Sequence, residues 1–171
     1  MRGRHWLYFG PIADANQARR QMIESLNFPP TLAFASGAIK TAQPTFSAIA
    51  TAFPDNVKLT TLTSNYAAFN DGALMLRVAH LYSVGEHPTL SAPATVSFAD
   101  IFSKAGLTIT GMRETTLSGN QDKAEWEAKK LHWETDVPAP PKSYVPFDSS
   151  DAELKVTLRP MEVRTFLVNF A

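Results

Sequence analysis

The four histidines are the first residues that could bind a metal or carry out acid–base chemistry, and their spacing does not suit a metal site. Zinc ligands usually lie a few residues apart on one helix or in one short loop. No pair of histidines has that spacing, and the chain has no cysteine to supply a thiolate. We therefore expect no metal site and no cofactor within the chain. The histidines are His5, His80, His87 and His132.

Carboxylates are the second group that could do chemistry. Glycoside hydrolysis uses two of them, one as general acid and one as nucleophile or base. The available pairs are Glu125 with Glu127 and Asp148 with Asp151, and Glu86 stands alone beside a turn. All lie in polar, turn-like contexts, where a solvated carboxyl group keeps its ordinary acidity and makes a poor general acid. We expect no catalytic residue in this chain.

Aromatic and charged side chains could instead contact a sugar or another domain. Trp126, Trp133 and Tyr144 are candidates for stacking on a pyranose ring, although core or interface packing is the commoner use of such residues. Glu162 and Arg164 lie two residues apart in the last predicted strand, so they share a face and point together toward another surface. Such a pair is either an interface contact or ordinary solvated surface.

Composition limits the class of protein. Sixteen basic residues balance sixteen acidic ones, so no net field would draw the chain to nucleic acid or to an anionic membrane. No stretch is long and apolar enough to span a membrane. Residues 1–6 hold two arginines and a histidine with no apolar run after them, which does not resemble a secretory signal. With 171 residues, 44% of them hydrophobic, we expect one domain around one core.

The first elements include one convincing helix. Apolar residues recur at helical spacing from Ala15 to Leu26, with Asp14 as the expected N-cap and Pro29 closing the element. Before it, the aromatic run His5 to Phe9 favours a strand. The segment from Glu125 to Trp133 is ambiguous between helix and strand, and we expect strand after Lys130.

Most of the remaining chain has strand patterns. Apolar residues alternate from Leu74 to Val84, which places His80 among buried neighbours as a neutral, hydrogen-bonded histidine. Residues 107–117 are rich in β-branched residues interrupted by Gly111, which indicates a bulge or a bend. Two closing strands run from Leu154 to Phe170, and we expect their core face to include Met161, Val163 and Leu167. The predicted fold is mainly β, an antiparallel β-sandwich with one N-terminal α-helix and long loops.

Several blocks of this chain resemble, in the same order, the C-terminal region of class II, lysosomal-type α-mannosidases, glycoside hydrolase family thirty-eight. They are spread over nearly the whole chain, and the last block is the most specific. The blocks are Arg2-Gly3-Arg4-His5; Leu76-Arg77 with His80 and Val84-Gly85-Glu86; Leu90-Ser91-Ala92-Pro93; Asp100 with Ile101-Phe102-Ser103; Glu114-Thr115-Thr116-Leu117 with Asn120-Gln121; and Pro160-Met161-Glu162-Val163-Arg164-Thr165-Phe166-Leu167.

The resemblance implies a parent enzyme that is a zinc-dependent, retaining hydrolase of terminal α-mannosides in N-glycan and oligosaccharide breakdown. In this family the zinc ligands and the nucleophile lie in an N-terminal α/β domain that has no counterpart here, so no catalytic residue carries over to this chain. Residues 1–171 are then expected to be a single C-terminal domain, a fragment of a larger enzyme. Its partners would be that catalytic domain and, through the parent, a mannose-containing oligosaccharide. The parent would be lysosomal, secretory or vacuolar, and a C-terminal fragment of it would carry no targeting signal of its own.

Two other functions stay open. The chain could be an autonomous sugar-binding module in which Trp126, Trp133 or Tyr144 stacks on mannose. It could also hydrolyse glycosides by itself, although the carboxylates and histidines offer no convergent site for that reaction.

Overall fold

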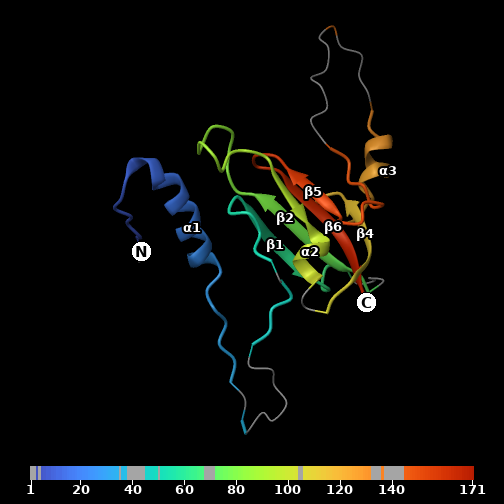
Figure 1. Ribbon diagram of the computed structural model, residues 1–171, viewed down its shortest axis with the longest axis horizontal. Coiled ribbons are helices and arrows are strands. Elements are labelled where there is room, and N and C mark those ends of the chain that lie inside the picture. Colours follow the sequence, from blue (N-terminus) through green and yellow to red (C-terminus); the bar gives the residue numbers. More distant parts are fainter. Residues whose placement is uncertain are drawn as a thin grey trace.

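The computed structural model is organised around two antiparallel sheets (Figure 1). It describes residues 3, 5–34, 36–37, 45–49, 51–67, 72–103, 106–131, 136 and 145–171. The larger sheet has the strand order β1-β2-β6-β4, and the smaller sheet pairs β3 with β5. The strands are β1 (Val57–Thr63), β2 (Leu74–His80), β3 (Ala94–Ser97), β4 (Ile109–Thr115), β5 (Lys155–Leu158) and β6 (Val163–Phe170).

The predicted N-terminal helix is confirmed as α1 (Ala15–Asn27). A short 3₁₀ helix precedes it, and Asp14 occupies the predicted N-cap position, although its side chain forms no capping hydrogen bond. Two shorter helices do have side-chain caps. Ser97 accepts from the backbone N–H of Asp100 at the start of α2 (Phe98–Phe102), and Asp122 accepts from Ala124 at the start of α3 (Lys123–Ala128).

One apolar core fills the space between the sheets, which confirms the predicted antiparallel sandwich. Its buried side chains come from both sheets and from α2, and each fully buried apolar side chain contributes about 1.5 to 3 kcal/mol to stability. The core residues are Val57, Leu76, Val78, Ala94, Val96, Phe98, Ile101, Phe102, Met112, Val156, Leu158, Phe166 and Val168.

A bulge lets β4 present its apolar and charged side chains to this core. Ile109 pairs with Phe170 and Met112 pairs with Val168, and the register shifts between Ile109 and Gly111. Successive residues of a strand point to opposite faces, so without the extra residue Ile109 and Met112 would lie on opposite faces of the sheet. The predicted irregularity at Gly111 is therefore a bulge within one strand.

The expected core face of β6 is wrong. Phe166 and Val168 enter the core, whereas Val163 is 44% exposed and Met161 lies in the preceding turn with its side chain exposed. Leu167 is buried on the opposite face of the sheet. Both faces of β6 carry apolar residues, so alternation by itself did not identify the side that packs between the sheets.

A second, smaller cluster of buried apolar residues lies on the outer face of the central strands β2 and β6. Met75 and Leu167 pack there with Ala73, and the turn after β4 approaches them closely. In that turn Gly119 has a φ of 75°, and a Cβ at this position would collide with the end of the Met75 side chain. The positive φ is the reason that glycine is favoured here, whereas the flexible end of Met75 could move aside for a Cβ.

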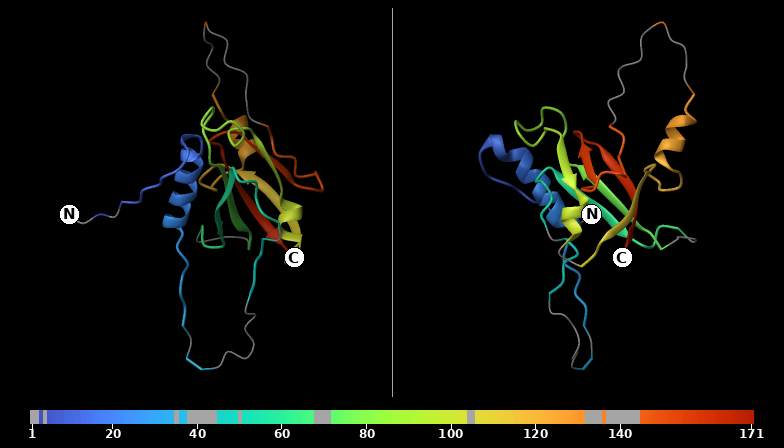
Figure 2. Two further views of the ribbon diagram at one scale, coloured as in Figure 1. Left: turned by 60° about the vertical axis from the view of Figure 1, so that its left-hand side comes forward. Right: turned by 45° about the vertical axis from the view of Figure 1, so that its right-hand side comes forward.

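The expected strand at residues 5–9 is not formed. None of the described strands pairs with this segment, and Figure 2 shows the chain before α1 extending away from the sheets. Its aromatic side chains are exposed, and Phe9 is 89% exposed. A strand needs a hydrogen-bonded neighbour, so a strand-prone sequence without one stays irregular.

The side of β6 that packs between the sheets can be tested by two truncations. We expect Phe166→Ala to lower the free energy of unfolding by about 3 to 5 kcal/mol, because it leaves a cavity in the core. The control, Val163→Ala on the exposed face, should cost about 1 kcal/mol or less. Urea unfolding of both variants provides the comparison. Equal losses, or a larger loss for Val163→Ala, would show that the strand faces are assigned the wrong way round.

Candidate functional site

A buried ion pair links β4 to β6 beside the core. Arg164 Nε lies 3.1 Å from Glu114 Oε1, and Arg164 Nη2 lies 2.6 Å from Glu114 Oε2. The side chains of Arg164 and Glu114 are only 3% and 7% exposed. Two parallel hydrogen bonds between a guanidinium and a carboxylate form one of the strongest and most directional pairs available to proteins.

The same guanidinium also reaches the second sheet. Arg164 Nη1 donates to the carbonyl oxygen of Thr157 in β5 at 3.2 Å, and the guanidinium carbon lies 5.7 Å from the centre of the Phe166 ring. Arg164 therefore connects the two layers of the sandwich. A buried charge costs several kcal/mol unless it is paired, and Glu114 supplies that pairing.

This geometry corrects the expected orientation of Glu162 and Arg164. Arg164 points into the domain and does not share an outer surface with Glu162. Glu162 lies in the turn before β6, where its Oε2 accepts from the backbone N–H of Arg159 at 2.9 Å. The expectation is wrong for Arg164, because this long charged side chain lies on the core side of its strand. An interface or sugar contact by Glu162 stays a prediction.

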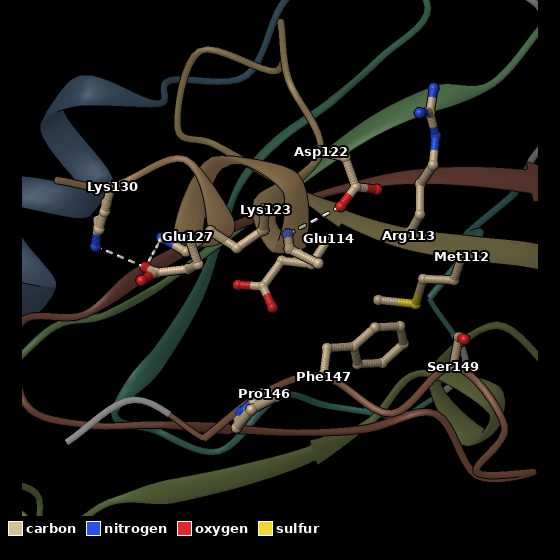
Figure 3. Close-up of a pocket in the computed structure, with 11 residues that line it drawn as sticks. Met112, Arg113, Glu114, Asp122, Lys123, Glu127, Lys130, Pro146, Phe147 and Ser149 are labelled. Atoms are coloured by element: carbon tan, nitrogen blue, oxygen red, sulfur yellow. Dashed lines mark hydrogen bonds and ion pairs between the residues drawn. The ribbon is translucent and has the colours of Figure 1, made fainter. Parts of the chain in front are cut away.

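An open pocket of about 680 Å³ lies next to the ion pair (Figure 3). In Figure 3 the side chains of α3 lie on one side, and Pro146 and Phe147 lie on the other. Met112 and Phe147 give it an apolar wall, and Glu114, Glu127 and Lys130 add charge. The Nζ of Lys130 lies 2.8 Å from Glu127 Oε1, so opposite charges already meet at its rim. Among the described residues, no three histidine, aspartate or glutamate side chains gather as a metal site would require.

The candidate carboxylate pairs do not have the setting of a general acid. Glu125 is exposed beside Lys129, with Nζ and Oε2 3.6 Å apart. Hydrogen bonds from the Ser150 hydroxyl and backbone N–H lower the pKa of Asp148, the opposite of what an acid catalyst needs. Asp151 accepts from the backbone N–H groups of Glu153 and Lys155 and so organises a turn.

Glu86 has a different setting from the other carboxylates and fixes the position of α1. Its Oε2 accepts from Arg20 Nη2 at 2.8 Å and from the Ser83 backbone N–H at 2.8 Å, and its Oε1 accepts from Arg19 Nη2 at 2.9 Å. The Glu86 side chain is only 10% exposed. The hydrogen bonds from Arg20, and after them that from the Ser83 backbone, lower the pKa of Glu86 to about 2. We call Glu86 with Arg19 and Arg20 the Glu86 latch.

His80 is buried and hydrogen-bonded, as the alternation predicted. Its Nε2 lies 2.9 Å from the carbonyl oxygen of Ala92, and its Nδ1 lies 3.2 Å from the backbone nitrogen of Tyr82. Its Nδ1 also lies 3.1 Å from the carbonyl oxygen of Tyr82, so the tautomer decides which of these contacts are hydrogen bonds. Asn56 donates from Nδ2 to the carbonyl oxygens of Leu90 and Ala92, so the two side chains together hold residues 90–92 against the end of β2.

Of the three aromatic candidates, the structure describes only Trp126. Its side chain is 37% exposed and lines an open groove of about 930 Å³ that also includes Arg77 and Leu117. The Nζ atoms of Lys130 and Lys123 lie 3.8 and 4.6 Å from its ring centre. A sugar that stacked on Trp126 would compete with these cation–π contacts. Trp133 and Tyr144 lie outside the described residues.

Sequence reasoning missed the partners of these side chains. Glu114 shares the inward phase of Met112, and Arg164 shares that of Phe166, so strand phase could have indicated that the two charges face the same interior. Nothing in the local sequence pairs Glu86 with Arg20, because 66 residues separate them. That contact depends on where the folded chain places α1.

Comparison with known proteins agrees with the observed β-sandwich. Residues 56–166 match the model of the glycosyl hydrolases family 38 C-terminal beta sandwich domain. Lysosomal alpha-mannosidase of Bos taurus is 34% identical over 177 residues, and the match covers 99% of this chain and 17% of the relative. Lysosomal alpha-mannosidase of Homo sapiens is 33% identical, with 99% and 16% covered. An alpha-mannosidase of Canavalia ensiformis is 31% identical, with 99% and 17% covered.

The chain therefore belongs to glycosyl hydrolase family 38 and corresponds to the C-terminal β-sandwich region of its α-mannosidases. It spans only about a sixth of the length of these relatives. No helix in the described part of the chain is long and apolar enough to cross a membrane.

The Glu86 latch predicts a defined pH dependence. The pKa of Glu86 falls from about 4.5 in the unfolded chain to about 2 in the folded one, so its stabilisation is complete above about pH 4.5 and disappears as the pH falls from 4.5 toward 2. We expect Glu86→Gln to cost on the order of 1 to 3 kcal/mol at pH 7 and the same amount at pH 5. The cost should shrink below pH 4.5. Chemical unfolding of both proteins at pH 7, 5 and 3 measures it, and a cost that does not change between pH 5 and 3 would contradict the assigned pKa.

Proposed function

We propose that this chain is the non-catalytic C-terminal β-sandwich of an α-mannosidase and that it packs against the catalytic domain of the same protein. The parent would hydrolyse terminal α-D-mannosyl residues of N-glycans and related oligosaccharides. The observation that carries the proposal is the match of 99% of the chain to α-mannosidases about six times its length.

The contacts of the described polar residues support a structural role. The blocks that resemble the mannosidases contain Arg164, Glu114 and His80, and each of these side chains is buried in a hydrogen bond or ion pair within the domain. Buried side chains with such contacts hold strands together. Catalysis, in contrast, requires side chains that a substrate can reach.

Zinc dependence is part of the proposal for the parent and not for this chain. The described residues offer no cluster that fits a zinc ion, so the ligands would come from the catalytic domain. The sandwich would contribute by packing against that domain and completing the rim of its cleft.

A lysosomal or vacuolar location of the parent is proposed from the lysosomal relatives. The Glu86 latch is compatible with an acidic compartment, because a carboxyl group with a pKa of about 2 stays ionised at pH 5.

A second function, sugar binding by the chain alone, rests on the partly exposed Trp126 and the groove beside it. The ring is already in contact with two lysine ammonium groups. This observation favours the packing role over the sugar-binding one, and the two differ in whether the isolated chain responds to mannose.

The proposed function is tested with a chromogenic α-mannoside in the presence of zinc. We expect the 171-residue chain to give no turnover, because its described residues bring no acid and nucleophile together, and we expect the mannosidase-length polypeptide that contains it to cleave the substrate. Deleting residues 56–171 from that polypeptide should abolish active, soluble enzyme.

Turnover that follows the purified 171-residue chain would overturn this assignment. Mannose should not change the tryptophan fluorescence of the chain at millimolar concentrations. A saturable change that Trp126→Ala removes would favour the sugar-binding module instead.

A further inference from the structure

Residues 5–34, which we call the N-terminal arm, expose an unusual number of large apolar side chains. No residue of α1 is buried, and the segments on both sides of it are more exposed still. Several large apolar side chains exposed within one segment are candidates for contact with another surface. The most exposed are Leu7, Phe9, Ile12, Phe28, Leu32 and Phe34.

Polar contacts nevertheless hold the arm in a defined position. The Glu86 latch binds α1 near its start, where Asn16 Nδ2 also donates to the carbonyl oxygen of Glu86 at 3.1 Å. Near its end, Lys58 of β1 forms an ion pair with Glu24 and lies 3.8 Å from the centre of the Phe28 ring. The helix is thus fixed to the sandwich without burying its apolar residues, which leaves them available for another contact.

The arm also lies beside an edge of the larger sheet, where another domain could pack. In both Figure 1 and Figure 2, α1 runs beside the sheet on the side of β1, and β1 is an edge strand. Edge strands of stable proteins are usually covered. A partner that covered the arm would bury this side of the sandwich as well.

The comparisons indicate what the partner is. The sandwich model begins at residue 56, whereas the matches to whole α-mannosidases cover 99% of the chain and therefore include the arm. The arm thus belongs to the mannosidase polypeptide but lies outside the matched sandwich. The rest of that polypeptide is about five-sixths of its length.

We propose that the N-terminal arm is the surface by which this domain docks on the remainder of a mannosidase-length polypeptide, and that residues 5–9 add to a sheet edge of that remainder as a strand. This inference rests on the function proposed above. His5 to Phe9 has the composition of a strand buried on both faces, because apolar side chains occur at consecutive positions. Addition to an existing edge would supply the backbone hydrogen bonds that the segment does not form with the described strands.

Hydrogen exchange tests the inference at the backbone. We expect amides of residues 6–10 to exchange at least roughly tenfold more slowly in the mannosidase-length polypeptide than in the 171-residue chain, because strand pairing protects them. The turn at residues 116–121 is the internal control and should exchange at the same rate in both. Equal exchange of residues 6–10 in the two proteins overturns the inference.

Side-chain variants test the same surface independently. The double variant Leu7→Ser with Phe9→Ser should lower the melting temperature of the mannosidase-length polypeptide by several degrees and leave that of the 171-residue chain unchanged, because both side chains are exposed there. The control is Leu117→Ser, which replaces an exposed leucine in the turn after β4 and should change the melting temperature of neither protein. An equal effect of the arm variant and the control in the long polypeptide counts against the inference.

The outcomes separate this inference from the proposed function. Mannosidase activity in a long polypeptide whose arm is unprotected overturns the docking surface alone. A protected arm in a long polypeptide without α-mannosidase activity supports docking and overturns the proposed function. Self-association of the 171-residue chain that the arm variant abolishes would assign the surface to a second copy and overturn the partner proposed here.

Discussion

The cost of burying two charges is the constraint on which this sandwich depends. Arg164 and Glu114 are almost completely removed from water, and each would be strongly destabilising without the other. In the register of β4 with β6, Glu114 lies opposite Phe166, and Arg164 comes two residues earlier on the same face. A slip of one residue would turn Arg164 to the other face and leave both charges unpaired. The pair therefore favours the observed register over its neighbours.

Other features of the fold follow from that arrangement. The bulge at Gly111 places Ile109, Met112 and Glu114 on one face, so the carboxylate can enter the core with its apolar neighbours. Across the layer, the carbonyl oxygen of Thr157 receives a hydrogen bond from Arg164 and joins β5 to β6. On the outer face, Leu117 accepts from Arg77 and Thr165 through its carbonyl oxygen, which holds the turn after β4 over the sheet.

These contacts explain the blocks that resemble the α-mannosidases. Two of them, residues 114–117 and 160–167, lie far apart in the sequence and meet across β4 and β6. Glu114 comes from the first and Arg164 from the second. The resemblance is thus carried by residues that build the sandwich, as expected for the structural role proposed above.

Sequence reasoning succeeded where one local pattern determines the structure. Helix α1 and the buried His80 follow from periodicity, and Gly111 indicated an irregularity in β4. It failed where the outcome depends on distant partners. Both faces of β6 carry apolar residues, so its core side is determined by β5 and α2 on one side and by Met75 on the other.

The failures at the N-terminal arm and at the charged residues have related causes. Residues 5–9 have strand composition but no partner strand among the described residues. The charged side chains Arg164 and Glu86 were expected at solvated positions, and each is held by a residue more than 45 positions away. Such pairs cannot be read from local spacing.

A double-mutant cycle on Glu114 and Arg164 tests the central claim most directly. Unfolding free energies would be measured for the 171-residue chain, for Glu114→Gln, for Arg164→Met and for the double variant. Arg164→Met should cost about 3 to 5 kcal/mol, because it leaves a buried carboxylate without its counter-ion. The double variant should lose less than the sum of the single losses, by about 1 to 3 kcal/mol. Single losses below about 0.5 kcal/mol that simply add would contradict a fold that depends on this pair.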